Sequence, residues 1–287
     1  MTNDRKGYLT EFMRDFDFPD EAQSSASDAL DKIFAVPECR GVLENVCRLY
    51  EKNREFDWSA AIDSAARLAE LSSQNVFTVN LVVLVLLTEI SKKHYTAEGV
   101  SEEIWRQNFK DLRYKCAECK LVKGVHGIFC PGWYDRFFNV TRFSFGKLQF
   151  ETNDFGHEYS KNGLSLLPED RVIYVHIPRT GEKLYPADVD DACLNASAFY
   201  KKKYGFERIV FVCHSWLLYP LNKQLLSENS NLYSFISRFD IIEEGESADY
   251  KDAWRLFDVE YNGDPEELPR DTSFRKAYYQ RIKNREP

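Results

Sequence analysis

The hydrophobic pattern of this chain changes close to residue 140, where strand-like segments first appear, and that change limits the folds available. Before it, apolar residues recur every three or four positions, which is typical of amphipathic helices. After it, segments that alternate or form short β-branched runs, which is typical of strands, are mixed with segments of helical spacing. The pattern predicts an α+β protein, with an all-α N-terminal domain over residues 1–135 and a mixed β-sheet domain with flanking helices over residues 136–287.

The N-terminal part has the apolar spacing of a helical bundle. Its most apolar run, Val76 to Ile90, is interrupted by polar residues and is too short to span a bilayer. We therefore expect this run to form a buried helix surrounded by the others. Those helices are expected to begin near residues that favour helix starts, which are Pro19, Pro37, Asp57 and Ser101.

The C-terminal part mixes strands and helices. Strands are predicted over residues 140–145, 147–151, 172–177 and 209–212, and two later ones over residues 239–242 and 254–261. Residues 157–170 are predicted to form a loop. Helices are predicted over residues 188–204, 221–226 and 272–283, the first of them ended by Gly205. The strand at 209–212 has a β-branched run that predicts burial on both of its faces.

Polar side chains gather where these strands end. His176 stands at the end of one strand, and the strand at 209–212 is followed directly by Cys213, His214 and Ser215. One predicted helix separates the two strands, which indicates a βαβ unit whose parallel strands end at the same edge. Ligands of open α/β sheets bind at that edge. Glu151, at the end of a third predicted strand, is expected to join them.

The net charge and the cysteine content limit the kinds of partner and the compartment that we expect for this protein. The net charge of −8 argues against general binding to nucleic acid or to anionic membranes, because both favour a basic surface. Seven cysteines at irregular spacing do not suggest a disulfide framework. We expect a cytoplasmic protein with reduced thiols that acts on a small molecule.

One segment of the helical part has the residue types of a small zinc site, namely Cys116, Cys119, His126 and Cys130. The alternative is that the first two are buried thiols one turn apart on the same helix. Helical periodicity continues through Leu112, which favours buried thiols. No metal is therefore expected.

Four segments of the chain resemble a known bacterial family. They are Gly-Lys-Leu-Gln-Phe-Glu at 146–151, Val-His-Ile-Pro at 175–178, Val-Cys-His-Ser-Trp-Leu-Leu at 212–218 and Leu-Pro-Arg-Asp-Thr-Ser at 268–273. The family is that of acyltransferase-domain proteins with a helical N-terminal domain and a GNAT-like C-terminal domain. The resemblance covers most of the chain, and it implies an acyltransferase that uses acetyl-CoA or another acyl-CoA as co-substrate.

The resemblance also implies where the donor binds. In GNAT domains a strand, a loop and a helix follow one another, and backbone N–H groups of the loop and the helix start hold the CoA pyrophosphate. Here the loop contains Arg179, Thr180, Gly181 and Lys183. It has a single glycine where the superfamily has several, so the charges of Arg179 and Lys183 are expected to contribute more to phosphate binding.

GNAT chemistry needs a base for the attacking amine and an acid for the leaving thiolate. His176, His214 or Glu151 suits the first role, and Ser215, Cys213 or Tyr219 suits the second. A covalent route through Cys213 and His214 is disfavoured, because adjacent residues of a strand point to opposite faces.

Two other functions fit the same residues. The first is a catalytically silent GNAT-like module that binds a ligand or partner. The second is a metal-dependent enzyme, because Glu151, His176 and His214 have the residue types of a facial metal site.

Overall fold

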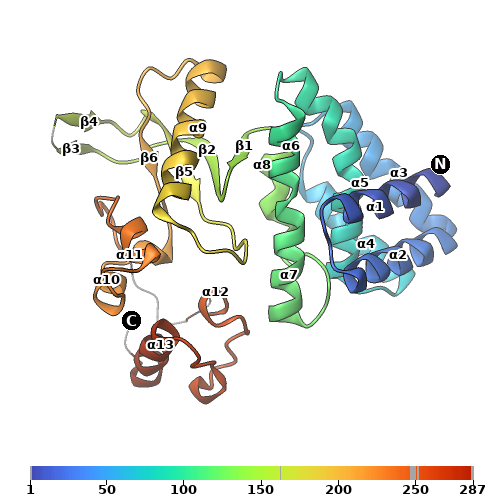
Figure 1. Cartoon of the computed structure of the whole chain (residues 1–287). Helices are drawn as coiled ribbons and strands as arrows, with labels where there is room; N and C mark the ends of the chain where they lie inside the picture. The colour runs from blue at the N-terminus through green and yellow to red at the C-terminus, as the bar shows by residue number, and fades with distance from the viewer. Residues whose placement is uncertain (1, 162, 246–249, 251, 286–287) are drawn as a thin grey trace. The chain divides into compact units, whose positions relative to one another are not determined.

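The chain forms two compact units, Met1–Phe143 and Ser144–Pro287. The computed structural model describes residues 2–161, 163–245, 250 and 252–285. Figure 1 shows helices alone in the first unit and a mixture of strands and helices in the second. The predicted α+β class, with an all-α part before a mixed sheet, is confirmed.

The first unit is built around one buried helix. This helix, α5 (Val76–Ala97), is buried at every position from Thr78 to Thr88 and packs against the helices around it. The prediction of a buried central helix is confirmed. The surrounding elements are α1 (Thr2–Asp15), α2 (Asp20–Ala35), α3 (Pro37–Lys52), α4 (Ser59–Ser72), α6 (Glu102–Phe109), α7 (Asp111–Lys123), a 3₁₀ turn (Pro131–Tyr134) and α8 (Asp135–Phe138).

Polar residues inside α5 are satisfied by a segment that follows α7. The Thr78 hydroxyl donates to the carbonyl of His126 at 2.9 Å, and the Asn80 amide donates to the carbonyl of Ile128 at 2.9 Å. Gly127 allows this approach, because a Cβ there would lie 2.3 Å from the carbonyl carbon of Phe77. Only glycine fits so close to a neighbouring backbone.

The second unit contains a mixed four-stranded sheet in the order β1-β2-β5-β6. Its strands are β1 (Arg142–Phe145), β2 (Leu148–Asp154), β5 (Arg171–His176) and β6 (Phe211–Val212). Strand β5 pairs antiparallel with β2 and parallel with β6. A separate antiparallel hairpin consists of β3 (Tyr159–Lys161) and β4 (Leu164–Leu166).

Helix α9 (Pro186–Tyr204) connects the two parallel strands and lies against the sheet (Figure 1). The Tyr200 hydroxyl donates to the carbonyl of Phe150 at 2.9 Å, and the ring of Phe199 packs against that of Phe145. The predicted βαβ unit, with its helix ending at Gly205, is confirmed.

Four predictions for this unit are wrong in whole or in part. The strand at 209–212 contains only Phe211 and Val212, and both are half-buried, because β6 is an edge strand that pairs with β5 alone. Residues 157–170 are not only loop, since Leu164–Leu166 forms a hairpin strand and Leu166 packs against the sheet. Residues 239–242 form no strand, and 254–261 begins as helix α12 (Trp254–Phe257), which buries Phe257.

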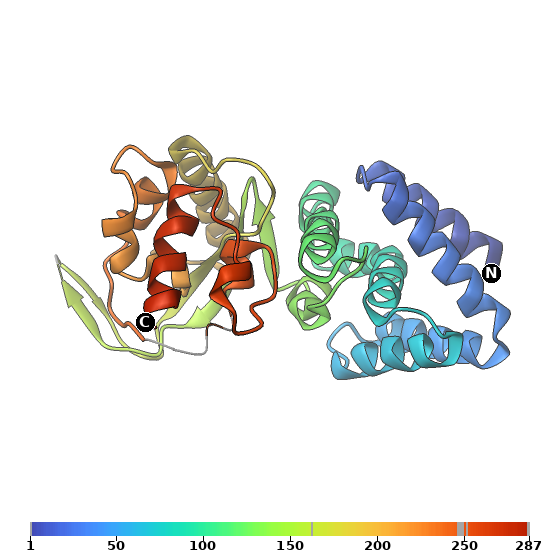
Figure 2. The same ribbon diagram turned by 90° about the horizontal axis from the view of Figure 1, so that it is seen from below.

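Short helices gather beyond the carboxyl ends of β5 and β6 (Figures 1 and 2). They are a 3₁₀ turn (Trp216–Leu218), α10 (Leu221–Leu225), α11 (Asn231–Ile236), α12, a second turn (Pro265–Glu267) and α13 (Ser273–Asn284). The helices predicted at 221–226 and 272–283 are confirmed. A buried apolar cluster joins α12 and α13 through Phe257, Leu268, Tyr279 and Ile282.

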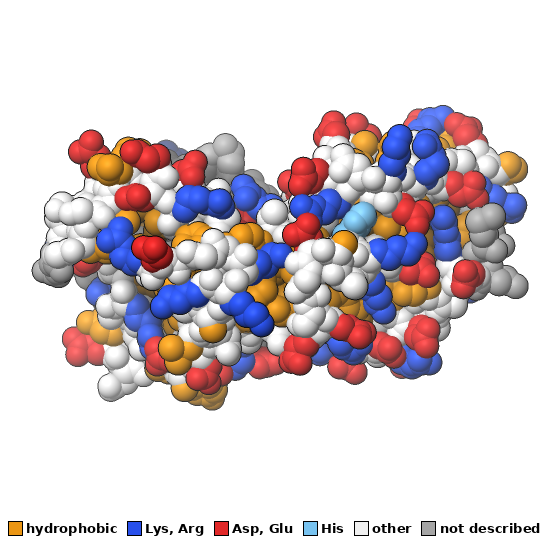
Figure 3. Space-filling view, turned by 90° about the horizontal axis from the view of Figure 1, so that it is seen from above, with side chains coloured by type: hydrophobic (Ala, Val, Ile, Leu, Met, Phe, Trp, Pro, Cys, Tyr) orange, Lys and Arg blue, Asp and Glu red, His pale blue; other side chains and the backbone are white. Residues whose placement is uncertain are grey.

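The surface mixes charges of both signs. On the face shown in Figure 3, basic and acidic side chains are interspersed. None of the helices in the described residues combines the length and the apolar character needed to cross a bilayer.

Candidate functional site

The parallel strands β5 and β6 separate near their carboxyl ends. They are paired at Ile173–Phe211 and Tyr174–Val212, and the N–H of Ile173 donates to the carbonyl of Val210 at 2.9 Å. Extending this register by two residues would place His214 beside His176. Both residues are described, and the pairing ends before either of them. The pairing of the two histidine-bearing segments therefore ends two residues before the histidines.

Glu151 and His176 form a side-chain pair across β2 and β5. Glu151 is the register partner of Tyr174, and His176 is the partner of Gln149, so both side chains lie on one face of the sheet. Oε1 of Glu151 lies 2.9 Å from Nε2 of His176. The side chain of Glu151 is 6% exposed and that of His176 is 19% exposed. A buried carboxylate thus orients an imidazole that solvent and ligands can still reach.

His214 and Ser215 lie past the end of β6. The ring of His214 is exposed and makes no hydrogen bond to Glu151 or His176 within the described residues. The hydroxyl of Ser215 accepts the N–H of Leu217 at 3.3 Å and caps the turn that follows. Of the predicted catalytic residues, the structure brings Glu151 and His176 together and leaves His214 and Ser215 on a neighbouring segment.

Cys213 is a poor nucleophile in this position. Burial raises the pKa of its thiol to about 12, so the thiolate is scarce near neutral pH. The neighbouring His214 is exposed and makes no hydrogen bond to it in the part of the chain that the structure describes. The environment therefore does not favour a covalent route through this thiol.

A buried amide fixes the turn that follows Ser215. Nδ2 of Asn222 donates to the carbonyls of Trp216 at 2.9 Å and Leu217 at 3.1 Å. Its Oδ1 accepts a short hydrogen bond from the hydroxyl of Tyr278 on α13. The side chain of Asn222 is fully buried, and it ties the segment after β6 to the C-terminal helix. Nothing in the local sequence pattern signals this role.

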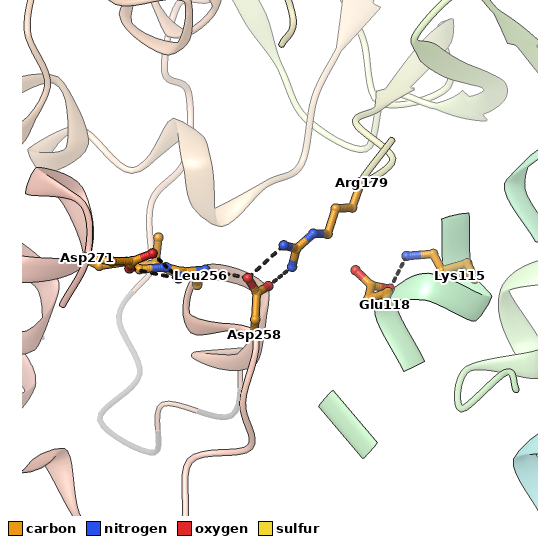
Figure 4. A network of polar contacts seen from close by, with 7 residues as sticks. Lys115, Glu118, Arg179, Leu256, Asp258 and Asp271 are labelled. Carbon is orange, nitrogen blue, oxygen red and sulfur yellow. Dashed lines mark hydrogen bonds and ion pairs between the residues drawn. The ribbon is translucent and has the colours of Figure 1, made fainter. Parts of the chain in front are cut away.

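The loop after β5 carries the predicted CoA-binding residues. Arg179 points to Asp258, which caps α12 (Figure 4), and donates from Nη2 to its carboxylate at 2.7 Å. Arg275 donates to the same carboxylate at 2.5 Å. The Thr180 hydroxyl accepts the N–H of Glu182 at 3.1 Å, and Gly181 has a φ of 80°, so these residues form a tight turn.

The start of α9 already holds a carboxylate. Oδ2 of Asp188 accepts the N–H of Tyr185 at 2.9 Å and the ammonium of Lys147 at 2.9 Å. Lys147 also donates to the carbonyl of Lys183 at 2.8 Å. The hydrogen bond from Lys147, followed by that from Tyr185, lowers the pKa of Asp188. Within the described residues, Arg179 is the only cation of the predicted CoA-binding loop whose side chain is bonded to another residue.

A cavity of about 970 Å³ lies beside the end of β6. Its lining includes the continuous run from Val210 to Trp216, together with residues of the β3–β4 hairpin and of the C-terminal helices. His214 and Ser215 lie in this lining, whereas His176 and Glu151 do not. The end of β6 therefore lies in the wall of a large cavity that His176 and Glu151 do not line.

The candidate metal sites do not assemble in the described residues, which contain no group of three or more His, Cys, Asp or Glu side chains placed to hold a metal ion. Sγ of Cys116 lies 4.0 Å from Nδ1 of His126. Burial raises the pKa of Cys116 and that of Cys119 to about 12. On the same helix, Lys115 donates to Glu118 at 2.7 Å (Figure 4). This segment supplies packing and internal ion pairing.

Comparisons with known proteins match both units. The model of the N-acyltransferase N-terminal domain matches residues 7–140, and that of the GNAT-like C-terminal domain matches residues 143–286. A sequence comparison with curated proteins finds no match.

Solved acyltransferase structures share the fold. One, bound to decanoyl-CoA and teicoplanin, is 16% identical with a TM-score of 0.70. A second, bound to decanoyl-CoA, is 18% identical with a TM-score of 0.69, and a mutant bound to octanoyl-CoA is 17% identical with the same score. Each comparison covers 96% of this chain and 83% of the other.

Proposed function

Since this chain belongs to the family of N-acyltransferases that joins a helical N-terminal domain to a GNAT-like C-terminal domain, we propose that it transfers an acyl group from acyl-CoA to the amine of a small molecule. The solved acyltransferases that share its fold bind octanoyl-CoA or decanoyl-CoA, which supports an acyl-CoA donor. Seven free cysteines support a reducing compartment, and we place the protein in the bacterial cytoplasm.

The contact between Glu151 and His176 carries this proposal. An ionised carboxylate only accepts hydrogen bonds, so Glu151 favours the tautomer with the proton on Nε2 of His176. The lone pair is then on Nδ1, which takes the proton from the amine as its nitrogen attacks the thioester carbon. The carbon–sulfur bond breaks next, and the CoA thiolate leaves with a proton. Glu151 acts as a positioning residue and His176 as the base.

Ser215 is the proposed acid for the leaving thiolate. Its oxygen accepts the N–H of Leu217, which leaves the hydroxyl proton able to point elsewhere. A serine hydroxyl is a weak acid, so Ser215 gives its proton to the thiolate as it takes another from a neighbouring group. His214 stands beside Ser215 on the exposed segment, where it can exchange protons with solvent.

The donor phosphates are proposed to bind at the loop with Arg179, Thr180, Gly181 and Lys183. Because Arg179 is bonded to Asp258, a phosphate must compete with that carboxylate or share the guanidinium with it. Within the described residues, the ammonium group of Lys183 makes no hydrogen bond or ion pair. Its position after the turn suits a charge–charge contact with a phosphate.

The decisive experiment follows CoA release from acetyl-, octanoyl- and decanoyl-CoA with a panel of small amines. His176→Ala is expected to lower kcat by about 10²- to 10⁴-fold, which is the usual contribution of a general base. His214→Ala is expected to abolish turnover while leaving the Tm nearly unchanged, because the ring is exposed. A large fall in Tm with either variant would mean that the histidine is structural.

A silent binding module is the second candidate. Two observations favour it. The carboxylate of Asp258 accepts a hydrogen bond from Arg179, and the carboxylate of Asp188 accepts a backbone N–H at the start of α9. Both features place carboxylates where donor phosphates would bind. Thermal-shift measurements separate the candidates, because a ligand that binds only the folded state raises its Tm. No shift with any CoA ester at millimolar concentration would leave only the module.

A further inference from the structure

The cavity beside β6 lies between two apolar clusters. On the sheet side, Leu166 belongs to a buried cluster with Phe155 and Val172, against which Val210 and Val212 pack. On the opposite side, Phe257 and Ile282 belong to the cluster that joins α12 and α13. Residues of both clusters line the cavity. Its walls are thus the apolar surfaces of two separately stabilised clusters.

The cavity begins where the two parallel strands part. Val210 and Val212 line it, and Val212 is the last residue of β6 paired with β5. Its partner Tyr174 lies on the same face of β5 as His176, two residues further along. A thioester held between the diverging segments near His176 therefore has an apolar cavity next to its acyl carbons.

Three charged side chains that line the cavity already have protein partners. Asp240 accepts from Lys161 at 2.7 Å and from Tyr159 at 2.9 Å. Arg238 is bonded to Asp190, and Glu243 pairs with His157 at 3.2 Å. The volume of about 970 Å³ is at the upper end of small-molecule sites and far exceeds what an acetyl group fills. The lining therefore suits a large apolar group.

We propose that this cavity holds the acyl chain of the donor, and that the donor is a linear medium- or long-chain acyl-CoA. The inference rests on the proposed function and adds the class of acyl group. Residues Val212 and Ala253, from the strand wall and from the start of α12, then set the chain length that fits.

Calorimetry with CoA, acetyl-, butanoyl-, octanoyl- and dodecanoyl-CoA tests this directly. Each added methylene that leaves water is worth about 0.8 kcal/mol, which corresponds to about a fourfold gain in affinity. The wild-type protein should therefore bind octanoyl-CoA more tightly than CoA by orders of magnitude. Val212→Phe and Ala253→Phe fill the cavity from opposite walls, and each should lower the dodecanoyl-to-CoA ratio at least tenfold.

Leu167→Phe is the matched control, because Leu167 is exposed, adjoins β4 and does not line the cavity. The ratio of dodecanoyl-CoA to CoA affinity of this variant should match that of the wild type. A wild-type ratio independent of chain length, with CoA itself bound, would overturn the acyl-chain inference but keep the proposed function. A ratio that both filling variants preserve would place the chain elsewhere. Absence of CoA binding to the wild type would overturn both proposals.

A second measurement uses unmodified protein, in case a filling variant does not fold. Cys213 lines the cavity, so a bound chain should shield it from alkylation by N-ethylmaleimide. Dodecanoyl-CoA is expected to slow this reaction at least tenfold more than CoA does at equal saturation. Equal protection by the two ligands would contradict the inference.

Discussion

Nε2 of His176 lies 2.9 Å from Oε1 of Glu151 across the antiparallel pair of β5 and β2. The two residues are diagonal neighbours in the register, 25 positions apart in the chain, and both side chains lie on the face of the sheet opposite to that of Phe150. The strand that carries the histidine then leaves its parallel partner after Tyr174. An oriented imidazole thus stands beside an opening in the sheet.

Removing the carboxylate while keeping its shape should slow the chemistry. Glu151→Gln is expected to lower kcat by about 10- to 100-fold, because the amide orients the ring less strongly and does not stabilise a charged imidazole. The KM for acyl-CoA should change little. Asp154→Asn is the control, since it makes the same chemical change at an exposed position of β2. Equal effects of both variants on kcat and KM would contradict a positioning role.

Arg179→Ala tests the loop after β5. We expect the Kd for CoA to rise about tenfold, because a charge-assisted hydrogen bond contributes about 1.5–3 kcal/mol. The Tm should fall only slightly, since Arg179 is about one-third exposed and solvent screens its pair with Asp258. Arg67→Ala removes a comparable arginine with two acidic partners from the other unit. Unchanged CoA affinity of Arg179→Ala would place the phosphates elsewhere.

The Cys213 thiol should show a distinctive pH dependence. Because burial raises its pKa to about 12, the thiolate fraction grows about tenfold per pH unit across the range in which the protein is stable. Alkylation of this residue by iodoacetamide, followed by peptide mass spectrometry, should rise with that slope from pH 7 to 9. A plateau in this interval, or an acyl adduct on Cys213 after incubation with acyl-CoA, would show a reactive thiolate.

Glu266 should make the C-terminal helix sensitive to acid. The ammonium of Lys283, the hydroxyl of Tyr279 and the guanidinium of Arg270 lower its pKa from 4.5 to about 2. A carboxyl whose pKa is lower when folded binds its proton more readily when unfolded. The stabilisation is therefore complete above about pH 4.5 and disappears as the pH falls toward about 2.

Hydrogen exchange of the amides in α13 between pH 6 and 2.5, corrected for the intrinsic rate, measures this effect. Protection in the wild type should fall across that interval. Glu266→Gln should have lower protection at pH 6 and a flatter pH dependence, whereas Glu228→Gln, at an exposed position, should behave like the wild type. A wild-type profile as flat as that of Glu266→Gln would contradict the assignment.

Local chemistry in the sequence was enough to predict the buried helix α5, the βαβ unit around α9 and the strands that carry Glu151 and His176. Helix starts, the glycine after α9 and the hydrophobic period act over a few residues, so they can be interpreted without the rest of the fold. The predictions failed where residues far apart in sequence decide the outcome. The apolar run at 254–257 packs as a helix because Phe257 is buried against α13.

The side-chain contacts of the candidate site were decided by the tertiary structure. A sequence places histidines and a glutamate near strand ends, but only the register of β2 against β5 makes Glu151, and not another residue, the partner of His176. Likewise, the folding back of the C-terminal segment gives Arg179 its carboxylate and supplies one wall of the cavity beside β6. Periodicity is a local property, whereas register, ion pairing and cavity walls are set by which segments meet, and that is decided by packing of the whole unit.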